Sequence, residues 1–319
     1  MISRKAYAKI NLSLDVTGVR PNGYHDVRMI MQSIGLYDEL TFEINDQYKT
    51  NDKYIYNQNS QSINSKNIDT KDEIPQITVN FIDLPENIDL GPIEKNLIYR
   101  SAKLILETYN IVDTGVIITL KKNIPVAAGM AGGSTDAAAV FHGLNELLTL
   151  GMTLDDMCSL GVKIGADVPF CIKGGTQLSE GIGEILTTLP TPPQVILLIA
   201  KPNIDVSTKM VYEALDSKPI SSHPDVDGMI NAISNLDLAK ISQLLGNVLE
   251  NVTVDMYPII NDIKKLMNEN GALNSLMSGS GPTVFGLFDP KDNKNAKKAA
   301  EAIKNAGLSN EVFITQFVS

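Results

Sequence analysis

The residues between 125 and 135 read Pro125-Val126-Ala127-Ala128-Gly129-Met130-Ala131-Gly132-Gly133-Ser134-Thr135. The pattern of residues 116–120 before this loop is typical of a strand, and the apolar spacing of residues 134–148 predicts a helix after it. Glycine lets the backbone approach a ligand closely and adopt unusual angles. The free N–H groups and the positive dipole end of the following helix attract anions. The loop is therefore predicted to bind phosphate groups, as a site suited to a triphosphate.

The same loop has a plainer interpretation as a tight strand-to-helix turn in which Ser134 caps the helix. The loop lacks the Gly-Lys-Ser/Thr ending of a P-loop, and its glycine spacing differs from the Rossmann fingerprint. The residues alone leave both interpretations open. A second glycine-rich segment, from Ser278 to Pro282, is by itself typical of a β-turn. It strengthens the phosphate-binding hypothesis because one chain contains two such loops.

Length and charge limit the remaining choices. The chain has 319 residues, 43% of them hydrophobic, and this length exceeds what one hydrophobic core usually spans. We expect two domains, residues 1–175 and residues 176–319. The formal net charge is −10, and the densest basic run, at residues 291–298, is typical of the solvated face of a helix. Because the sequence shows no basic stripe, we expect no nucleic-acid partner.

The cysteines and the apolar runs indicate the compartment. Cys158 and Cys171 each lie in an apolar stretch and are expected to be buried thiols, without a disulfide framework or metal-ligand spacing. The N-terminus lacks the apolar core of a signal peptide, and the run from Val195 to Ala200 is too short to span a membrane. These features predict a cytoplasmic protein without a membrane partner. The sequence leaves the oligomeric state open, as a monomer or a weak homodimer.

Apolar periodicity predicts a chain of mixed α and β structure. Alternation from Ala6 to Asp15 predicts a half-buried strand, and further strands are expected at 27–34 and 39–44. Strands and a helix alternate from residue 273 to 317, which indicates a small α+β sandwich. The polar stretch from Asn45 to Ile74 has too few apolar residues to offset its ordering entropy. It is interpreted as a flexible or hairpin-like surface excursion.

Polar residues in three segments are candidates for chemistry. Lys9 and Asn11 share the polar face of the first strand, where simple solvent exposure is the alternative. Tyr24 and His25 follow a turn and are suited to read a base or sugar by stacking and hydrogen bonding, unless the histidine is structural. Asp167 precedes a Pro-containing helix start, which is typical of a helix cap. A carboxylate with a nearby ammonium also orients an alcohol for phosphoryl transfer.

Five segments occur in a set order along the chain. They are Ala6-Tyr7-Ala8-Lys9-Ile10-Asn11-Leu12, Arg20-Pro21-Asn22-Gly23-Tyr24-His25, the loop from Pro125 to Thr135, Gly165-Ala166-Asp167-Val168-Pro169 and Met277-Ser278-Gly279-Ser280-Gly281-Pro282. This order closely resembles the GHMP kinases, which include galactokinase, homoserine kinase, mevalonate kinase and phosphomevalonate kinase. The loop alone marks the superfamily. The Lys-Ile-Asn strand and the Gly-Tyr-His turn resemble members that phosphorylate a diphosphocytidyl sugar alcohol in the non-mevalonate isoprenoid route.

The resemblance implies a two-domain GHMP kinase fold with ATP and Mg²⁺ as cofactors. The N-terminal domain would be a mixed sheet like domain 2 of ribosomal protein S5. The C-terminal domain would be a ferredoxin-like α+β sandwich, with the active site in the cleft between the domains. The loop from Pro125 to Thr135 would bind the ATP phosphates, while the metal ligands stay unknown. This chain has Met130 where the family more often has Leu, and Thr135 where Ser is commoner.

The resemblance also implies roles for single residues. Asp167 would be the catalytic base and contact the substrate, and Lys9 would be its charge partner. Asn11, Tyr24 and His25 would hold the diphosphocytidyl substrate, with Tyr24 stacking on the cytosine and His25 hydrogen-bonding to it.

Two other readings of the function are kept. The chain would be another GHMP kinase, with a homoserine- or mevalonate-type substrate, or a non-catalytic ligand sensor on the same fold. The first would lack the turn Gly23-Tyr24-His25, and the second would tolerate the loss of Lys9 or Asp167. Because all of these residues are present, the kinase of a diphosphocytidyl substrate is the preferred hypothesis.

Overall fold

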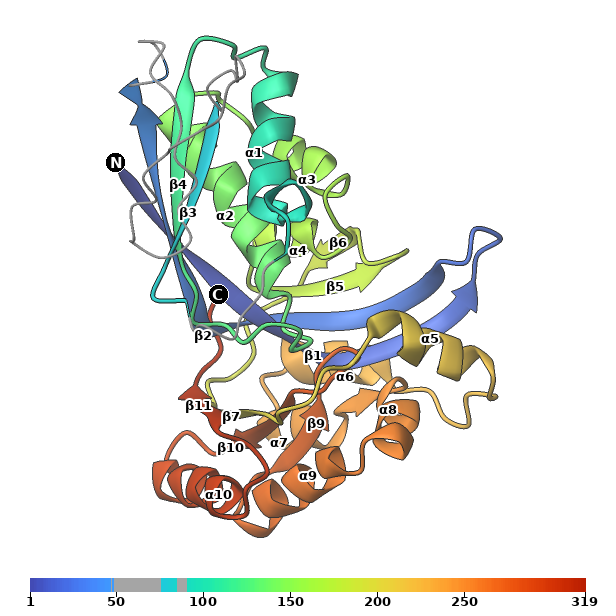
Figure 1. The fold of residues 1–319 in the computed structure, drawn as a ribbon. Coiled ribbons are helices and arrows are strands. Elements are labelled where there is room, and N and C mark those ends of the chain that lie inside the picture. The colour runs from blue at the N-terminus through green and yellow to red at the C-terminus, as the bar shows by residue number, and fades with distance from the viewer. Residues whose placement is uncertain (47, 49–75, 85–90) are drawn as a thin grey trace. The chain divides into compact units, whose positions relative to one another are not determined.

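The structure is a computed structural model that describes residues 1–46, 48, 76–84 and 91–319 (Figure 1). The chain forms two compact units, which are described separately. Unit 1 comprises Met1–Ala6, Tyr37–Ile124 and Gly132–Lys173, and unit 2 comprises Tyr7–Leu36, Pro125–Ala131 and Gly174–Ser319.

The two units are interleaved in the sequence, since residues 7–36 and 125–131 group with the C-terminal half. The domain boundary expected after residue 175 refers to segments that fold independently of each other. That boundary stays a prediction. The polar excursion predicted from Asn45 to Ile74 lies almost entirely outside the described residues.

The bounds of the elements are as follows. The strands are β1 (Ile2–Val19), β2 (His25–Asn45), β3 (Ile77–Ile82), β4 (Gly115–Lys121), β5 (Thr176–Glu180), β6 (Ile185–Thr188), β7 (Ile196–Lys201), β8 (Gly246–Asn247), β9 (Asn274–Met277), β10 (Val284–Phe288) and β11 (Glu311–Thr315). The helices are the short 3₁₀ helix η2 (Ile93–Lys95), α1 (Leu97–Thr108), α2 (Gly132–Leu147), α3 (Leu154–Gly161), α4 (Val168–Lys173), α5 (Thr208–Asp216), α6 (Val226–Ser234), α7 (Leu238–Gln243), α8 (Glu250–Met256), α9 (Ile259–Glu269) and α10 (Asn293–Asn305).

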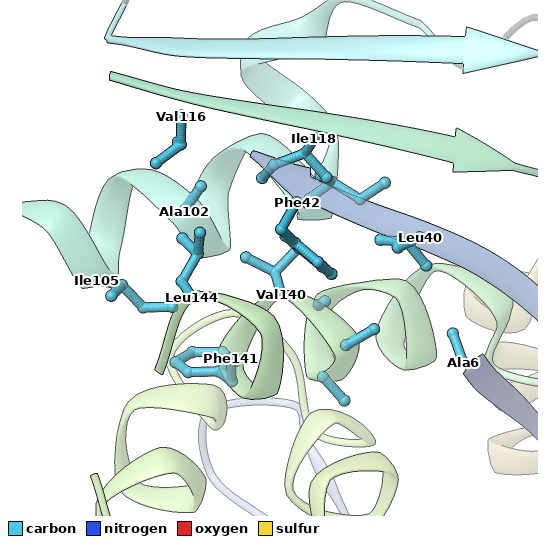
Figure 2. Close-up of a cluster of buried hydrophobic side chains, with 14 of the residues drawn as sticks. Ala6, Leu40, Phe42, Ala102, Ile105, Val116, Ile118, Val140, Phe141 and Leu144 are labelled. Atoms are coloured by element: carbon cyan, nitrogen blue, oxygen red, sulfur yellow. The ribbon is translucent and has the colours of Figure 1, made fainter. Parts of the chain in front are cut away.

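Unit 1 contains β3, β4, the second half of β2 and the first residues of β1, and helices cover these strands. β3 runs parallel to β4, and β4 runs antiparallel to the second half of β2, with Phe42 opposite Ile118. α1 and α2 pack against each other, and α1 contacts β3 (Figure 1). Figure 2 shows Leu40 and Phe42 of β2 close to Val140 of α2 in this apolar core. Burial of such side chains stabilises the fold by about 1.5–3 kcal/mol each, before the entropy cost of ordering them.

Gly143 shows how closely α2 approaches β2. A Cβ at this position would lie 2.4 Å from the ring of Phe42, so only glycine lets the helix pack here. Glycine in a helix interior costs about 1 kcal/mol relative to alanine, and the close contact offsets this cost. The contact fixes α2 on the strand and thereby fixes where its first turn, at Gly132, begins.

Unit 2 contains an antiparallel sheet of four strands in the order β11-β7-β10-β9. Every residue of the central strand β10 is buried. α9 and α10 pack against this sheet (Figure 1). Asp292 caps α10 by accepting the N–H of Asn295. This arrangement confirms the α+β sandwich that the alternation of strands and helix predicts.

The rest of unit 2 involves the two longest strands. The first half of β2 pairs with β5, β5 pairs with β6, and β1 runs parallel to the two-residue strand β8. The last residues of the chain lie along β2. Ile34 forms a bridge with Phe317, and Val318 both donates its N–H to Ser33 O at 3.0 Å and accepts from Gln32 Nε2 at 2.8 Å.

Two expectations about β structure are wrong. Residues 25–45 form one continuous strand instead of two. β1 is buried on both faces from Ala8 to Val16, instead of being half-buried. The cause is that glycine-rich backbone lies against its polar face, since a Cβ on Gly279 would be 3.7 Å from Asn11 Oδ1. A period-2 pattern shows that the two faces differ, and it does not show what covers the second face.

Two further expectations also need correction. α2 begins at Gly132, so Ser134 lies within its first turn and does not occupy the capping position. Cys158 and Cys171 are half-buried instead of buried, and burial is still the main cause that raises the pKa of Cys158. By contrast, the helix expected at 293–305 is confirmed, and its lysines are exposed. Among the described residues, no helix has both the length and the apolarity to cross a bilayer.

Candidate active site

A row of polar side chains runs along one face of β1 in unit 2. Lys9, Asn11, Ser13 and Asp15 alternate along the strand and therefore share a face. All are buried, with exposed fractions of 5%, 0%, 0% and 8%. Simple solvent exposure of Lys9 and Asn11 is thus the wrong alternative. Because buried polar groups cost free energy unless they are hydrogen-bonded, each needs a partner in the protein or in a ligand.

The protein supplies hydrogen-bond partners to three of the four side chains in this row. Lys9 Nζ donates to Asn11 Oδ1 at 2.8 Å, and Asn11 Nδ2 contacts the weak acceptor Met29 Sδ at 3.3 Å. Asp15 Oδ1 lies 2.7 Å from His223 Nδ1. Within the described part of the chain, Ser13 Oγ has no hydrogen-bond partner. The row therefore keeps polar capacity that a ligand can use.

The two glycine-rich loops, recognised separately in the sequence, meet in unit 2. Ser278 Oγ donates to Gly129 O at 3.0 Å. A Cβ on Gly129 would lie 2.5 Å from Ser278 O and 2.9 Å from Gly281 O, so no side chain fits there. Asn247 Nδ2 in turn donates to the carbonyls of Met277 and Gly279 at 2.9 and 2.8 Å. The second loop is thus held by Asn247 and braces the first.

The backbone of the first loop is strained. Ala127 and Ala131 have φ values of 52° and 57°, and Gly129 between them has 67°. A positive φ is unfavourable for alanine, and such strain concentrates at functional sites. Positive φ at alternate residues is also typical of backbone that turns several N–H groups toward one anion. Both features agree with the predicted phosphate site.

The last part of the predicted loop belongs to unit 1, where it begins α2. Ser134 is partly exposed and Thr135 is 2% exposed. Next to them lies a buried ion cluster that sequence reasoning missed. Lys122 Nζ donates to Asp38 Oδ2 and, at 3.1 Å, to Asp136 Oδ2. The signal in the sequence was a charged residue on each side of the loop, at 122 and at 136, within otherwise apolar elements.

The ion cluster contains two carboxylates and one ammonium. Asp38 Oδ1 also accepts the N–H groups of Asn123 at 2.6 Å and Ile124 at 2.8 Å. Burial raises the pKa of Asp136 well above its usual value of 3.8, and the nearby Asp38 adds to this, while Lys122 opposes it. Burial alone would lower the pKa of Lys122, but the two carboxylates outweigh it and the pKa is raised. Asp136 therefore holds a proton more tightly than an ordinary, exposed carboxyl group does.

Asp167 lies in unit 1, directly before α4. Its carbonyl oxygen accepts the N–H of Cys171 at 3.1 Å, so its backbone occupies the start of the helix. This placement agrees with a cap and does not exclude a chemical role for the carboxylate. Lys9 belongs to unit 2. The partnership of Lys9 with Asp167 therefore stays a prediction.

The turn before β2 presents Tyr24 and His25 differently. Tyr24 is 57% exposed, whereas the side chain of His25 is only 10% exposed. His25 Nε2 lies 2.7 Å from Asp216 Oδ1, and its ring centroid is 4.5 Å from that of Tyr212. Both partners come from α5. Sequence reasoning missed Tyr212 and Asp216, because no local pattern links them to a residue on another element.

Family models match both halves of the chain. The N-terminal domain of GHMP kinases matches residues 96–175, and the C-terminal domain of GHMP kinases matches residues 221–308. Among solved structures, a crystal structure of 4-(cytidine 5'-diphospho)-2C-methyl-D-erythritol kinase has a TM-score of 0.73 and 28% identity, over 100% of both chains. A homoserine kinase from Cytophaga hutchinsonii has a TM-score of 0.69 at 21% identity, covering 99% and 94% of the two chains, and shows the fold alone.

Curated relatives match more closely. A 4-diphosphocytidyl-2-C-methyl-D-erythritol kinase from Lachnoclostridium phytofermentans is 49% identical over 99% of this chain and 97% of its own. One from Lachnospira eligens is 45% identical over 99% of this chain and 98% of its own. The fold is thus the expected GHMP kinase fold, and the chain is an ATP-using kinase. The chain belongs to the GHMP kinases, and within them to the 4-diphosphocytidyl-2-C-methyl-D-erythritol kinase family.

Proposed function

We propose that this chain transfers the γ-phosphoryl group of ATP to the 2-hydroxyl of 4-diphosphocytidyl-2-C-methyl-D-erythritol, in the non-mevalonate route to isopentenyl diphosphate. The proposal rests on the identity of 45–49%, over 99% of the chain, to kinases named for that substrate. The homoserine kinase at 21% identity and an L. major mevalonate kinase at 16% support the fold only. They give no reason to prefer their own substrates.

The loop from Pro125 to Thr135 is proposed to bind the ATP phosphates. No lysine lies in this loop, so the backbone N–H groups and the first turn of α2 supply the attraction. The contact of Gly129 with the second glycine-rich loop supports this role, because it holds the strained backbone in place before ATP arrives. Such preorganisation lowers the cost of binding.

Asp167 is proposed as the catalytic base and Lys9 as its charge partner. Phosphoryl transfer depends mainly on positioning and on charge stabilisation, with a carboxylate to accept the hydroxyl proton. The acceptor is a tertiary alcohol, which is hindered and weakly acidic, so its orientation matters. Lys9 is buried, at 5% exposure, and its ammonium is held by Asn11 Oδ1 at 2.8 Å, which supports a fixed position for this charge.

Asn11, Tyr24 and His25 are proposed to hold the diphosphocytidyl group. The exposed ring of Tyr24 is available to stack on the cytosine. His25 is held by α5 and is proposed to hydrogen-bond to the same base. Asn11 lies in the buried row of β1, where its amide is suited to the polar part of the substrate. Asp167 is proposed to contact the accepting hydroxyl.

Mg²⁺ is proposed to enter with ATP. No group of three or more His, Cys, Asp or Glu residues suited to a metal ion occurs among the described residues. This fits Mg²⁺, which proteins usually bind through one or two oxygens together with substrate phosphates and water. Bound Mg²⁺ would neutralise charge that develops on the phosphates.

The remaining partners are also proposals. The chain is proposed to act in the cytoplasm, as a monomer or weak homodimer, without a nucleic-acid or membrane partner. The net charge of −10 supports the absence of a nucleic-acid partner, because phosphate backbones require a basic surface.

A coupled assay of ADP formation tests the function. The cytidyl substrate, mevalonate and homoserine are supplied side by side with ATP and Mg²⁺. We expect kcat/KM for the cytidyl substrate to exceed the others by roughly 100-fold or more, about 2.7 kcal/mol. Turnover of mevalonate or homoserine in preference would overturn the substrate. Binding of ATP without turnover of any acceptor would favour a ligand sensor.

A further inference from the structure

His25 is held from two sides by one face of α5. The helix is capped by Ser207, and Tyr212 and Asp216 lie four residues apart, so they share a helix face. The carboxylate of Asp216 contacts Nε2 of the imidazole at 2.7 Å, and the Tyr212 ring lies beside it at 4.5 Å with an interplanar angle of 38°. The ring of His25 can therefore neither rotate nor exchange its two nitrogens freely.

The contact with Asp216 decides which nitrogen carries the proton. An ionised carboxylate only accepts hydrogen bonds, so Nε2 must be the donor. In a neutral imidazole the other nitrogen, Nδ1, is then an acceptor. This nitrogen is left for a ligand of the turn, because Asp216 occupies Nε2.

We propose that Asp216 is a positioning residue that fixes His25 with Nε2 protonated and Nδ1 as an acceptor, and that this makes the turn select cytosine over uracil. Cytosine presents an amino donor at C4, where uracil presents a carbonyl acceptor. An Nδ1 acceptor therefore pairs with cytosine and opposes the lone pairs of uracil. The inference rests on the proposed function, in which His25 contacts the base.

Tyr212 supports the same arrangement from the ring face. Its ring limits the tilt of the imidazole, and an aromatic pair of this kind adds about 0.5–1.5 kcal/mol beyond the area it buries. Asp216 fixes which nitrogen of His25 carries the proton, and Tyr212 fixes the orientation of the imidazole plane. Neither residue needs to touch the reacting hydroxyl.

The first measurement reads the tautomer directly, in the free full-length protein. Long-range ¹H–¹⁵N spectra of the imidazole nitrogens are recorded at pH 8, and the His25 signals are identified with a His25→Gln variant. We expect wild-type His25 to be neutral with the proton on Nε2. Asp216→Ala should give a mixture of both tautomers. A wild-type His25 with its proton on Nδ1 would overturn the inference, whatever the enzyme phosphorylates.

The second measurement reads selectivity. The ratio of kcat/KM for the cytidyl substrate to that for its uridyl analogue is compared between wild type and Asp216→Ala. We expect this ratio to fall roughly tenfold, which corresponds to the loss of one net hydrogen bond of about 1.4 kcal/mol. KM for ATP should stay constant. Asp216→Asn keeps an oxygen acceptor for Nε2. Its ratio of kcat/KM values should therefore lie between those of wild type and Asp216→Ala.

Glu213→Ala is the matched control. Glu213 lies on the same helix and pairs with Lys209 at 3.7 Å, with its side chain 62% exposed. It should leave both the tautomer and the ratio unchanged. The side chain of Asp216 is 44% exposed, so its variants are expected to fold, which a thermal melt checks.

If Asp216→Ala scrambles the tautomer and leaves the ratio unchanged, selection by Asp216 is wrong while the proposed function stands. If wild type phosphorylates no cytidyl substrate, the proposed function is wrong and cytosine selection falls with it.

Discussion

Two groups of buried polar side chains, one in each unit, are built differently. In unit 1, Asp38, Lys122 and Asp136 form a compact ion cluster in which the protein supplies most of the partners. In unit 2, the row on β1 is held by the hydrogen bond of Lys9 to Asn11 within the row and by the contact of Asp15 with His223 outside it. One buried oxygen of each group, Asp136 Oδ1 and Ser13 Oγ, has no partner in the described chain. The first group joins β2, the end of β4 and α2 through opposite charges.

The comparison indicates that buried charged groups serve either stability or ligand binding. A buried ion cluster whose charges are paired locks elements together, and breaking it costs stability. A buried row with unused polar capacity is suited to bind and position a ligand. We therefore expect substitutions in the cluster to lower the free energy of unfolding, and substitutions in the row to lower turnover. The following predictions begin with the largest expected effect.

The largest effect is expected at the proposed catalytic pair. Asp167→Asn keeps the shape of the side chain and removes the proton acceptor, so kcat should fall by about 10²- to 10⁴-fold with little change in KM. Lys9→Met keeps the stem, removes the charge and should also lower kcat. The double variant should be less impaired than the product of the single effects, because groups that act as a unit are non-additive.

Steady-state kinetics of the four proteins checks this pair. Strictly multiplicative effects would show that Lys9 and Asp167 work independently. A near-normal kcat for Asp167→Asn would reduce Asp167 to a helix cap.

The same substitution in the ion cluster should act on stability instead. Lys122→Met leaves two buried carboxylates without their ammonium, and the free energy of unfolding should fall by about 3–5 kcal/mol. Lys9→Met is the matched control and should lower it much less. Urea denaturation at pH 7 measures both variants. If Lys9→Met proves the more destabilising, the assignment of the two groups to stability and to chemistry is reversed.

Substitution of the two carboxylates of the cluster should lower the free energy of unfolding by different amounts. Asp38→Asn disturbs an oxygen that accepts two backbone N–H groups and should cost about 2 kcal/mol of unfolding free energy. Asp136→Asn replaces a carboxyl group that holds its proton tightly, so it should cost less than about 1 kcal/mol.

The pH dependence follows from the raised pKa of Asp136. An acid with a raised folded pKa binds its proton more tightly when folded, so its contribution to stability is lost as the pH rises above 3.8 toward the folded pKa. Asp136→Asn has no such loss and should gain stability relative to wild type as the pH rises. Denaturation at a series of pH values checks the sign. A relative gain on acidification would contradict it.

A modest effect on substrate binding is expected at Tyr24, which is exposed in the proposed substrate site. Tyr24→Ala should raise KM for the cytidyl substrate roughly tenfold, about 1.4 kcal/mol, and leave KM for ATP nearly unchanged. The unfolding free energy should stay the same, because Tyr24 is 57% exposed. A rise in the ATP KM instead would mean that the two subsites are assigned the wrong way round.

The sequence predicted the local features of this molecule well. The alternation on β1, the helix at 293–305 and both glycine-rich loops follow from neighbouring residues, whose spacing carries the signal. The family could also be predicted, because the order of five motifs is specific.

The sequence could not predict contacts between distant segments. Neither the close approach of Gly129 to Ser278 nor the pairing of His25 with Asp216, 191 residues apart, has a local pattern. The burial of Lys9 is of the same kind, since it depends on what covers the strand. Such contacts are decided by tertiary packing, which overrides the preference of any single segment.

The bridge between Ile34 and Phe317 has a consequence for synthesis on the ribosome. Gln32 and Val318, which bond beside this bridge, are 286 residues apart. At about 5–20 residues per second, this stretch of β2 waits roughly 15–60 s for its partner. Every residue of unit 1 has been translated by Lys173, so that unit can begin to fold much earlier. During this interval β2 lacks its C-terminal partner at Ile34, and exposed strand edges of this kind favour aggregation.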